Sequence, residues 1–78
     1  IRMNREDTIK LLNMSYYLMH KTEDDVAESV ARDLYDFAID KTEDKDIQCQ
    51  AQLGRAEYKD RLKTIRYLNH RLNLGIHA

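Results

Sequence analysis

The side chains whose spacing could do chemistry are mainly basic and lie in the last third of the chain. They recur every three or four residues as Arg55, Lys59, Lys63, Arg66 and His70. On one continuous helix, residues at this spacing project within an arc of about 80° and form a strip about 22 Å long. Tyr67 lies beside the strip and can add stacking or a hydrogen bond. These six residues form the candidate partner-binding site.

A strip of cations suits an acidic protein surface or the phosphates of a nucleic acid, and it can also be only a solvated helix face. The net charge of −1 and the isoelectric point of about 6.3 argue against a dedicated nucleic-acid binder. Glu43, Asp44 and Asp46 at the start of the same expected helix would repel phosphate. We therefore expect a protein partner, with nucleic acid as the alternative.

Carboxylates at helical spacing offer the second possible chemistry. Asp33, Asp36 and Asp40 recur at intervals of three and four residues on one expected helix. A metal ion in a helical protein is usually held by carboxylates from helices that face each other. These three lie on one helix and away from its apolar stripe, so we expect a solvated acidic face and no metal site.

No other group of residues has the pattern of a catalytic or cofactor site. The histidines His20, His70 and His77 are too scattered to bind zinc together with a single cysteine. Ser15 and Ser29 have no recognisable base nearby, and no glycine-rich phosphate loop is present. We expect neither enzymatic activity nor a cofactor.

Composition indicates an all-α fold. The 78 residues contain no proline and two glycines, and charged residues make up 35%. The tetrapeptide Lys-Thr-Glu-Asp occurs at residues 21–24 and 41–44 and separates runs of apolar residues at helical spacing. Each threonine is expected to cap the helix that follows it. We predict a single domain over residues 1–78 with helices at about 5–20, 23–40 and 43–74.

The third expected helix is about twice as long as the other two. Glycine is unfavourable inside a helix, so Gly54 is the expected site of a kink or of a close crossing with another helix. A four-helix version with a break near Gly54 is the alternative.

Charge and apolar surface together predict self-association. Residues 20–46 carry ten acidic and four basic side chains, whereas residues 47–78 carry two acidic and six basic ones. These blocks can pair within one chain or between two chains. The first helix is apolar on more than one face, and the third is too long for its partners. A homodimer is therefore expected.

A single cysteine, Cys49, excludes an intramolecular disulfide and favours the cytoplasm. No apolar run is long enough to span a membrane, so no membrane insertion is expected. The sequence thus predicts a small, non-enzymatic regulatory or inhibitory protein that binds another protein, or alternatively a nucleic-acid-binding regulator that uses the basic helix face.

Overall fold

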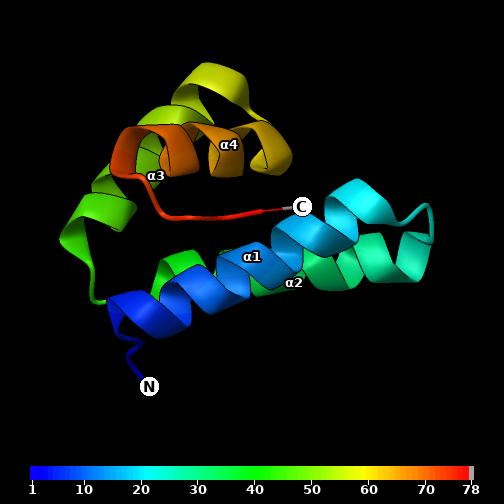
Figure 1. Cartoon of the computed structure of the whole chain (residues 1–78), viewed down its shortest axis with the longest axis horizontal. Coiled ribbons are helices and arrows are strands. Elements are labelled where there is room, and N and C mark those ends of the chain that lie inside the picture. The colour runs from blue at the N-terminus through cyan, green and yellow to red at the C-terminus, as the bar shows by residue number, and fades with distance from the viewer. Residues whose placement is uncertain (78) are drawn as a thin grey trace.

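Four helices pack as two antiparallel hairpins in the computed structural model, which describes residues 1–77 (Figure 1). The first hairpin consists of α1 (Arg5–Lys21) and α2 (Asp25–Lys41). The second consists of α3 (Lys45–Tyr58) and α4 (Arg61–Leu72). The all-α prediction is confirmed, and the first two helices begin and end within two residues of their predicted bounds.

The prediction of one long third helix is wrong, because the chain reverses at Lys59 and Asp60. Lys59 adopts a left-handed conformation with φ 54°, and Asp60 then caps α4 by accepting a hydrogen bond from the Lys63 N–H at 3.0 Å. The reversal lets α4 fold back and bury Ile65 and Leu68, which a straight helix would carry past the first hairpin. The energy of this burial outweighs the preference of lysine for right-handed backbone.

Gly54 does not break the helix; the break occurs five residues later. It is instead the point where α3 and α4 cross closely. A Cβ atom built on Gly54 would lie 3.0 Å from both Thr64 Cγ2 and Tyr67 Cδ2. A side chain at this position would force the side chains of Thr64 and Tyr67 to shift by a few tenths of an ångström.

The two Lys-Thr-Glu-Asp segments are the linkers of the fold, but threonine does not have the predicted role. Thr22 and Thr42 end α1 and α2, and the helices that follow are capped by Asp24 and Asp44. The Thr22 hydroxyl bonds back to the Leu18 carbonyl. Each linker therefore ends one helix with its threonine and starts the next with its aspartate.

The core lies between the hairpins and includes the C-terminal tail. Leu12, Ile47, Ile65 and Leu68 are fully buried, one or two from each of α1, α3 and α4. The tail runs back between α4 and α1 (Figure 1) and buries Leu74 and Ile76 there. Asn69 holds the tail by bonding both the N–H and the carbonyl of Ile76 at 2.9 and 3.0 Å.

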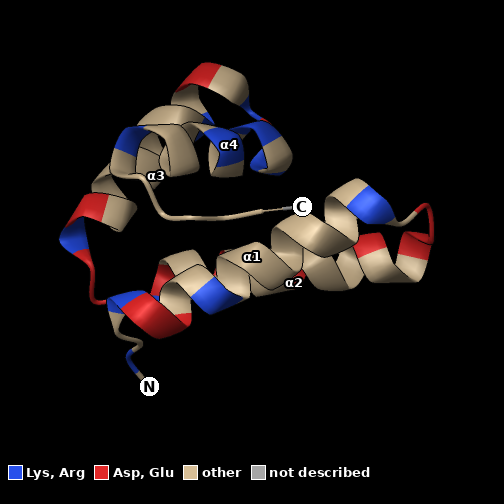
Figure 2. Cartoon of the chain, viewed as in Figure 1, with Lys and Arg blue, Asp and Glu red and all other residues tan. Residues whose placement is uncertain are grey.

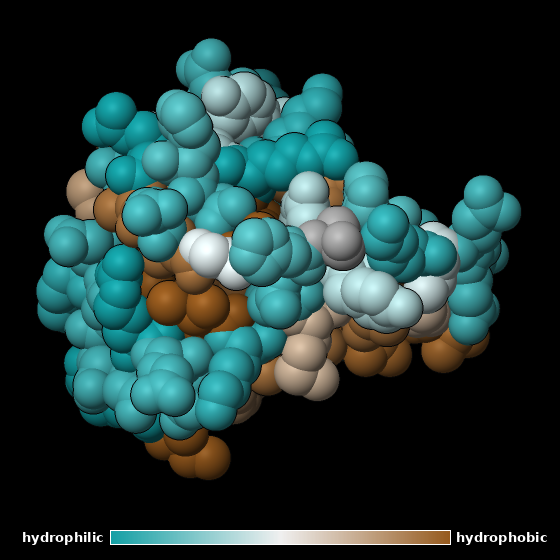
Figure 3. Space-filling view, viewed as in Figure 1, coloured by the Kyte–Doolittle hydropathy of each residue, from teal (hydrophilic) through white to brown (hydrophobic). Residues whose placement is uncertain are grey.

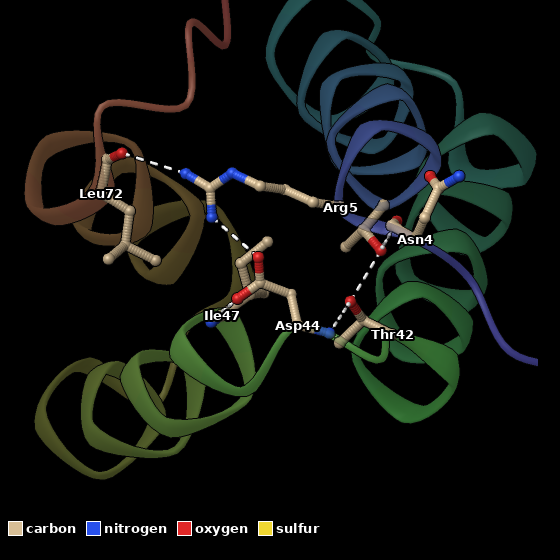
Figure 4. A network of polar contacts seen from close by, with 7 residues as sticks. Asn4, Arg5, Thr42, Asp44, Ile47 and Leu72 are labelled. Atoms are coloured by element: carbon tan, nitrogen blue, oxygen red, sulfur yellow. Dashed lines mark hydrogen bonds and ion pairs between the residues drawn. The ribbon is translucent and has the colours of Figure 1, made fainter.

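A polar junction ties the start of α1 to α3 and α4 (Figure 4). Arg5 donates to Asp44 Oδ2 at 2.8 Å and to the Leu72 carbonyl at 3.4 Å. Asp44 also accepts from the Ile47 N–H at 3.0 Å as the cap of α3. Thr8 donates to Thr42 at 2.7 Å within the buried part of the same junction. One carboxylate thus caps a helix and joins two hairpins.

Asp44 has a lowered pKa for the same reason. Partial burial by itself raises the pKa of this carboxyl, but the hydrogen bond from Arg5 and the backbone N–H bonds outweigh that effect. Asp44 therefore stabilises the fold fully above pH 3.8, its ordinary value, and this contribution is lost as the pH falls through the lower folded-state pKa.

The close crossing at Gly54 predicts that any side chain there separates α3 from α4. Gly54→Val should lower the free energy of unfolding by about 1–3 kcal/mol, because its methyl groups meet Thr64 and Tyr67. Urea denaturation followed by circular dichroism measures the loss. Ala56→Val on the exposed side of α3 is the matched control and should cost under about 0.5 kcal/mol. Equal losses in both variants would contradict the close-crossing role.

The two linkers provide a second matched comparison, because Asp24 and Asp44 occupy the same position of the repeat and both cap a helix. Asp44→Ala should destabilise by about 1–2 kcal/mol and by more than Asp24→Ala, because only Asp44 also binds Arg5. Urea denaturation at neutral and acidic pH measures both. The excess loss for Asp44→Ala should shrink in acid, and a pH-independent excess would refute the ionic contribution.

Candidate protein-binding surface

The chain reversal divides the predicted basic strip between two antiparallel helices. Arg55 lies on α3, Lys59 lies in the turn, and only Lys63, Arg66 and His70 remain together on α4. All five side chains are exposed. The continuous strip of about 22 Å expected for an unbroken helix is therefore absent, because the geometry that defined it required residues 55–70 to share one axis.

A shorter basic face remains on α4. Lys63, Arg66 and His70 are spaced three and four residues apart and point away from the buried Ile65 and Leu68. The helix has four Lys or Arg residues and no Asp or Glu, and Figure 2 shows its blue segments without red ones. Within residues 1–77, neither Lys63 nor Arg66 forms an ion pair. Both charges are available to an external partner.

Aromatic side chains of α1 extend this face. Arg66 Nε donates to the Tyr16 hydroxyl at 3.2 Å, and its guanidinium carbon lies 5.9 Å from the centre of the Tyr16 ring. Tyr16 in turn stacks on His20, with ring centres 5.6 Å apart and planes 4° from parallel. We call the surface formed by Lys63, Arg66, His70, Tyr16 and His20 the basic edge.

Sequence reasoning missed the α1 part of the basic edge. It placed Tyr16 in the apolar stripe of its helix, and the residue is indeed half-buried, but its hydroxyl reaches the surface at Arg66. The available signal was the four-residue spacing of Tyr16 and His20, which places two rings on one helix face. The contact with Arg66 spans 50 residues of sequence and depends on how the hairpins pack.

Tyr67, a predicted site residue, lies on the side of α4 that packs against α3. Its ring covers Gly54 and lies 5.8 Å from the Tyr58 ring, and its hydroxyl donates to Gln50 at 2.9 Å. These contacts hold α3 against α4. The half-buried Tyr67 therefore packs against α3, although it lies one turn from Lys63 and one turn from His70 on α4.

Arg55 and Lys59 line an open cleft of about 1220 Å³ between α2 and the second hairpin, together with Asp36, Arg61 and Tyr35. Arg61 forms two hydrogen bonds to Asp36, at 2.9 and 3.0 Å, which raise the pKa of its guanidinium. The acidic and basic blocks of the sequence thus pair within one chain at this point. The cleft is lined by charges of both signs and has no excess positive charge for a partner.

Tyr35 is buried at the wall of this cleft. Burial raises its pKa to about 12, and the Asp36 carboxylate adds to the shift, while Arg61 and Arg55 oppose it. Because the neutral phenol is favoured in the fold, its contribution to stability is full below pH 10.0 and is lost as the pH rises through about 12.

No cluster of three His, Cys, Asp or Glu side chains that could hold a metal ion occurs among the described residues. None of the helices in residues 1–77 has the length and apolar character needed to cross a membrane. A comparison of the chain with protein families, curated proteins and solved structures finds no match. The geometry and charge of its surfaces are therefore the guide to its function.

The environment of Tyr35 predicts a late titration step. In an alkaline titration followed by tyrosinate absorbance, one of the five tyrosines should ionise with a pKa of about 12 and not near 10.0. Tyr35→Phe should remove that step and leave the others in place. Tyr58→Phe, at an exposed ring, should keep it. A titration in which the Tyr35→Phe variant retains the late step would contradict the burial argument.

Proposed function

We propose that this protein is a small non-enzymatic regulator or inhibitor that binds an acidic surface of another protein through the basic edge. The observation that supports this function is the exposed face of α4, whose Lys63 and Arg66 have no carboxylate partner within residues 1–77. Two other cations are paired across the fold, Arg5 with Asp44 and Arg61 with Asp36.

The chemistry of the basic edge fits binding better than catalysis. Nucleophilic or acid–base catalysis requires a reactive group held beside a base or acid that activates it. The edge has cations and aromatic rings, and the Arg66 guanidinium is already fixed by Tyr16. A planar guanidinium beside a ring is a common component of protein interfaces, where it binds carboxylates in a defined orientation.

The size of the basic edge favours a protein over a nucleic acid. Lys63 and His70 are seven residues apart, which corresponds to about 10 Å along α4, less than half the length of the predicted strip. Few phosphates can be reached over this distance, whereas non-specific affinity for nucleic acid grows with the number of phosphates neutralised. The acidic α2 and the net charge of −1 would repel the remainder of a nucleic acid. Cys49, which is exposed and has no second cysteine to pair with, fits a cytoplasmic location.

Charge reversal on the basic edge tests the proposal. The probe is a fluorescent peptide of alternating glutamate and aspartate, and binding is measured by anisotropy at physiological salt. Lys63→Glu with Arg66→Glu should weaken binding at least about tenfold, which corresponds to about 1.4 kcal/mol. The control is Arg55→Glu with Lys59→Glu, which changes the net charge by the same amount but in the cleft. It should change binding less than about twofold.

Three results would contradict the proposal. One is the absence of any binding to the peptide, and another is an equal loss in both double variants, which would indicate only an effect of net charge. The third is tighter binding to a DNA or RNA duplex than to the peptide, with a steep salt dependence that Lys63→Glu and Arg66→Glu abolish. That result would establish the nucleic-acid-binding alternative.

A further inference from the structure

The α1–α2 hairpin has an apolar face that the second hairpin leaves uncovered, and His77 of the C-terminal tail lies beside Met14 and Leu18 at one side of it. Among its large side chains, Val26 is 69% exposed, Met14 53%, Val30 46% and Phe37 42%. Half-buried leucines lie between them. We call this surface the outer face; it consists of Leu11, Met14, Leu18, Val26, Val30, Leu34 and Phe37.

The outer face points away from the second hairpin. On α2, Asp36 reaches Arg61 of α4, and on α1, Tyr16 reaches Arg66 of α4. At 100° per residue, Phe37 and Val30 lie about 100° and about 120° around α2 from Asp36, and Met14 lies about 160° around α1 from Tyr16. Figure 3 shows brown apolar surface along the lower edge, under the α1–α2 hairpin. Exposed apolar side chains grouped in this way are typical of an interface.

The charges beside the outer face differ between its two helices. Lys10 lies one turn before Met14 along α1, and Asp33 and Asp40 lie within one turn of Phe37 along α2. The present contacts of these charges are local: Lys10 lies 3.9 Å from Glu6, and Asp40 lies 3.2 Å from Lys41. The outer face therefore has Lys10 along its α1 border and Asp33 and Asp40 along its α2 border, where Asp40 also lines the edge of the cleft beside the second hairpin.

The hydrogen bond between Thr8 and Thr42 shows which residues of α1 and α2 lie at the same height, measured along the axis of the α1–α2 hairpin. The helices are antiparallel, so two residues forward from Thr8 and two residues back from Thr42 reach Lys10 and Asp40. Asp7, at the end of the outer face, lies within one turn of the height of Lys41 by the same reasoning. Opposite charges therefore occur at matching heights on opposite borders.

A two-fold axis parallel to the helices makes these borders meet. It lays α1 of one copy on α2 of the other and leaves every residue at its own height. Lys10 then lies beside Asp40 of the second copy, and Asp7 lies near Lys41 of the second copy. Met14 and Leu18 lie against Leu34 and Phe37 of the second copy. A two-fold axis perpendicular to the helices would instead pack α1 on α1 of the second copy and place the aspartates of α2 beside the aspartates of the second copy.

We propose that a second copy of this chain covers the outer face, and that the two α1–α2 hairpins form a four-helix bundle with α1 packed on α2 of the second copy. The charge pattern and the apolar face both fit this occupant. The inference goes beyond the proposed function, because the basic edge lies on the α4 side and stays exposed in the dimer. A dimer would present two basic edges.

The first test is sedimentation equilibrium of the full chain. The wild-type protein should be a dimer at micromolar concentration, and Phe37→Glu should raise the dimer dissociation constant at least about tenfold. Leu53→Glu is the matched control, since Leu53 is 53% exposed on α3, away from the outer face, and it should leave the dimer intact. Circular dichroism checks that each variant is folded. A monomeric wild-type chain, or a dimer that Phe37→Glu does not weaken, would overturn the proposal.

Charge exchange tests the arrangement. Lys10→Glu and Asp40→Lys should each weaken the dimer several-fold, and the double variant should recover affinity because the pairs across the interface are restored with reversed sign. Additive losses in the double variant would refute this pairing.

Disulfide trapping in a Cys49→Ser background provides an independent measure. An equimolar mixture of Lys10→Cys and Asp40→Cys chains should give a cross-linked heterodimer on oxidation, while neither chain should cross-link efficiently alone. A Lys10→Cys chain that cross-links to itself would instead indicate the arrangement with α1 on α1 and overturn the proposed one.

Discussion

The ion pair between Arg5 and Asp44 sets how the two hairpins of this protein are joined. The Asp44 carboxylate caps α3, and Arg5 reaches from the start of α1 both to that carboxylate and to the end of α4 at Leu72. A helix cap and an inter-hairpin contact therefore share one side chain. Because the linker between α2 and α3 is only a few residues long, the direction of α3 is determined at this junction, and α3 in turn positions α4 against α1.

The reversal at Lys59 and Asp60 determines the surface chemistry as much as the fold. A straight helix would have extended its cations in one line beyond the first hairpin. Folding back buries Ile65 and Leu68, places Arg61 against Asp36, and leaves Arg66 beside the Tyr16 ring of α1. Gly54 favours this arrangement because a Cβ atom there would crowd the side chains of Thr64 and Tyr67. One close helix crossing thus sorts the basic residues into paired and unpaired sets.

The unpaired basic residues and the exposed apolar residues lie on two separate surfaces. The basic edge is formed by α4 and α1, whereas the outer face is formed by α1 and α2 on the side turned away from α4. Helix α1 contributes to both surfaces because it is apolar around much of its circumference. Its core residues, such as Leu12, lie on one flank, and the exposed Met14 lies on another. A chain of 78 residues has little interior to bury so many apolar side chains, so part of them must lie at the surface or at an interface.

The sequence by itself determined the fold class, the bounds of α1 and α2, and the position of both linkers, because periodicity and capping act over a few residues. It also singled out Gly54 and the residues Lys63, Arg66 and His70, although Asp60, a good cap residue, was the unused signal for the break. Only the tertiary structure decided that the strip is divided, that Tyr67 packs against α3, and that Tyr16 joins Arg66. These outcomes depend on contacts between residues far apart in sequence, and their energy comes from burying Ile65 and Leu68, which no local pattern encodes.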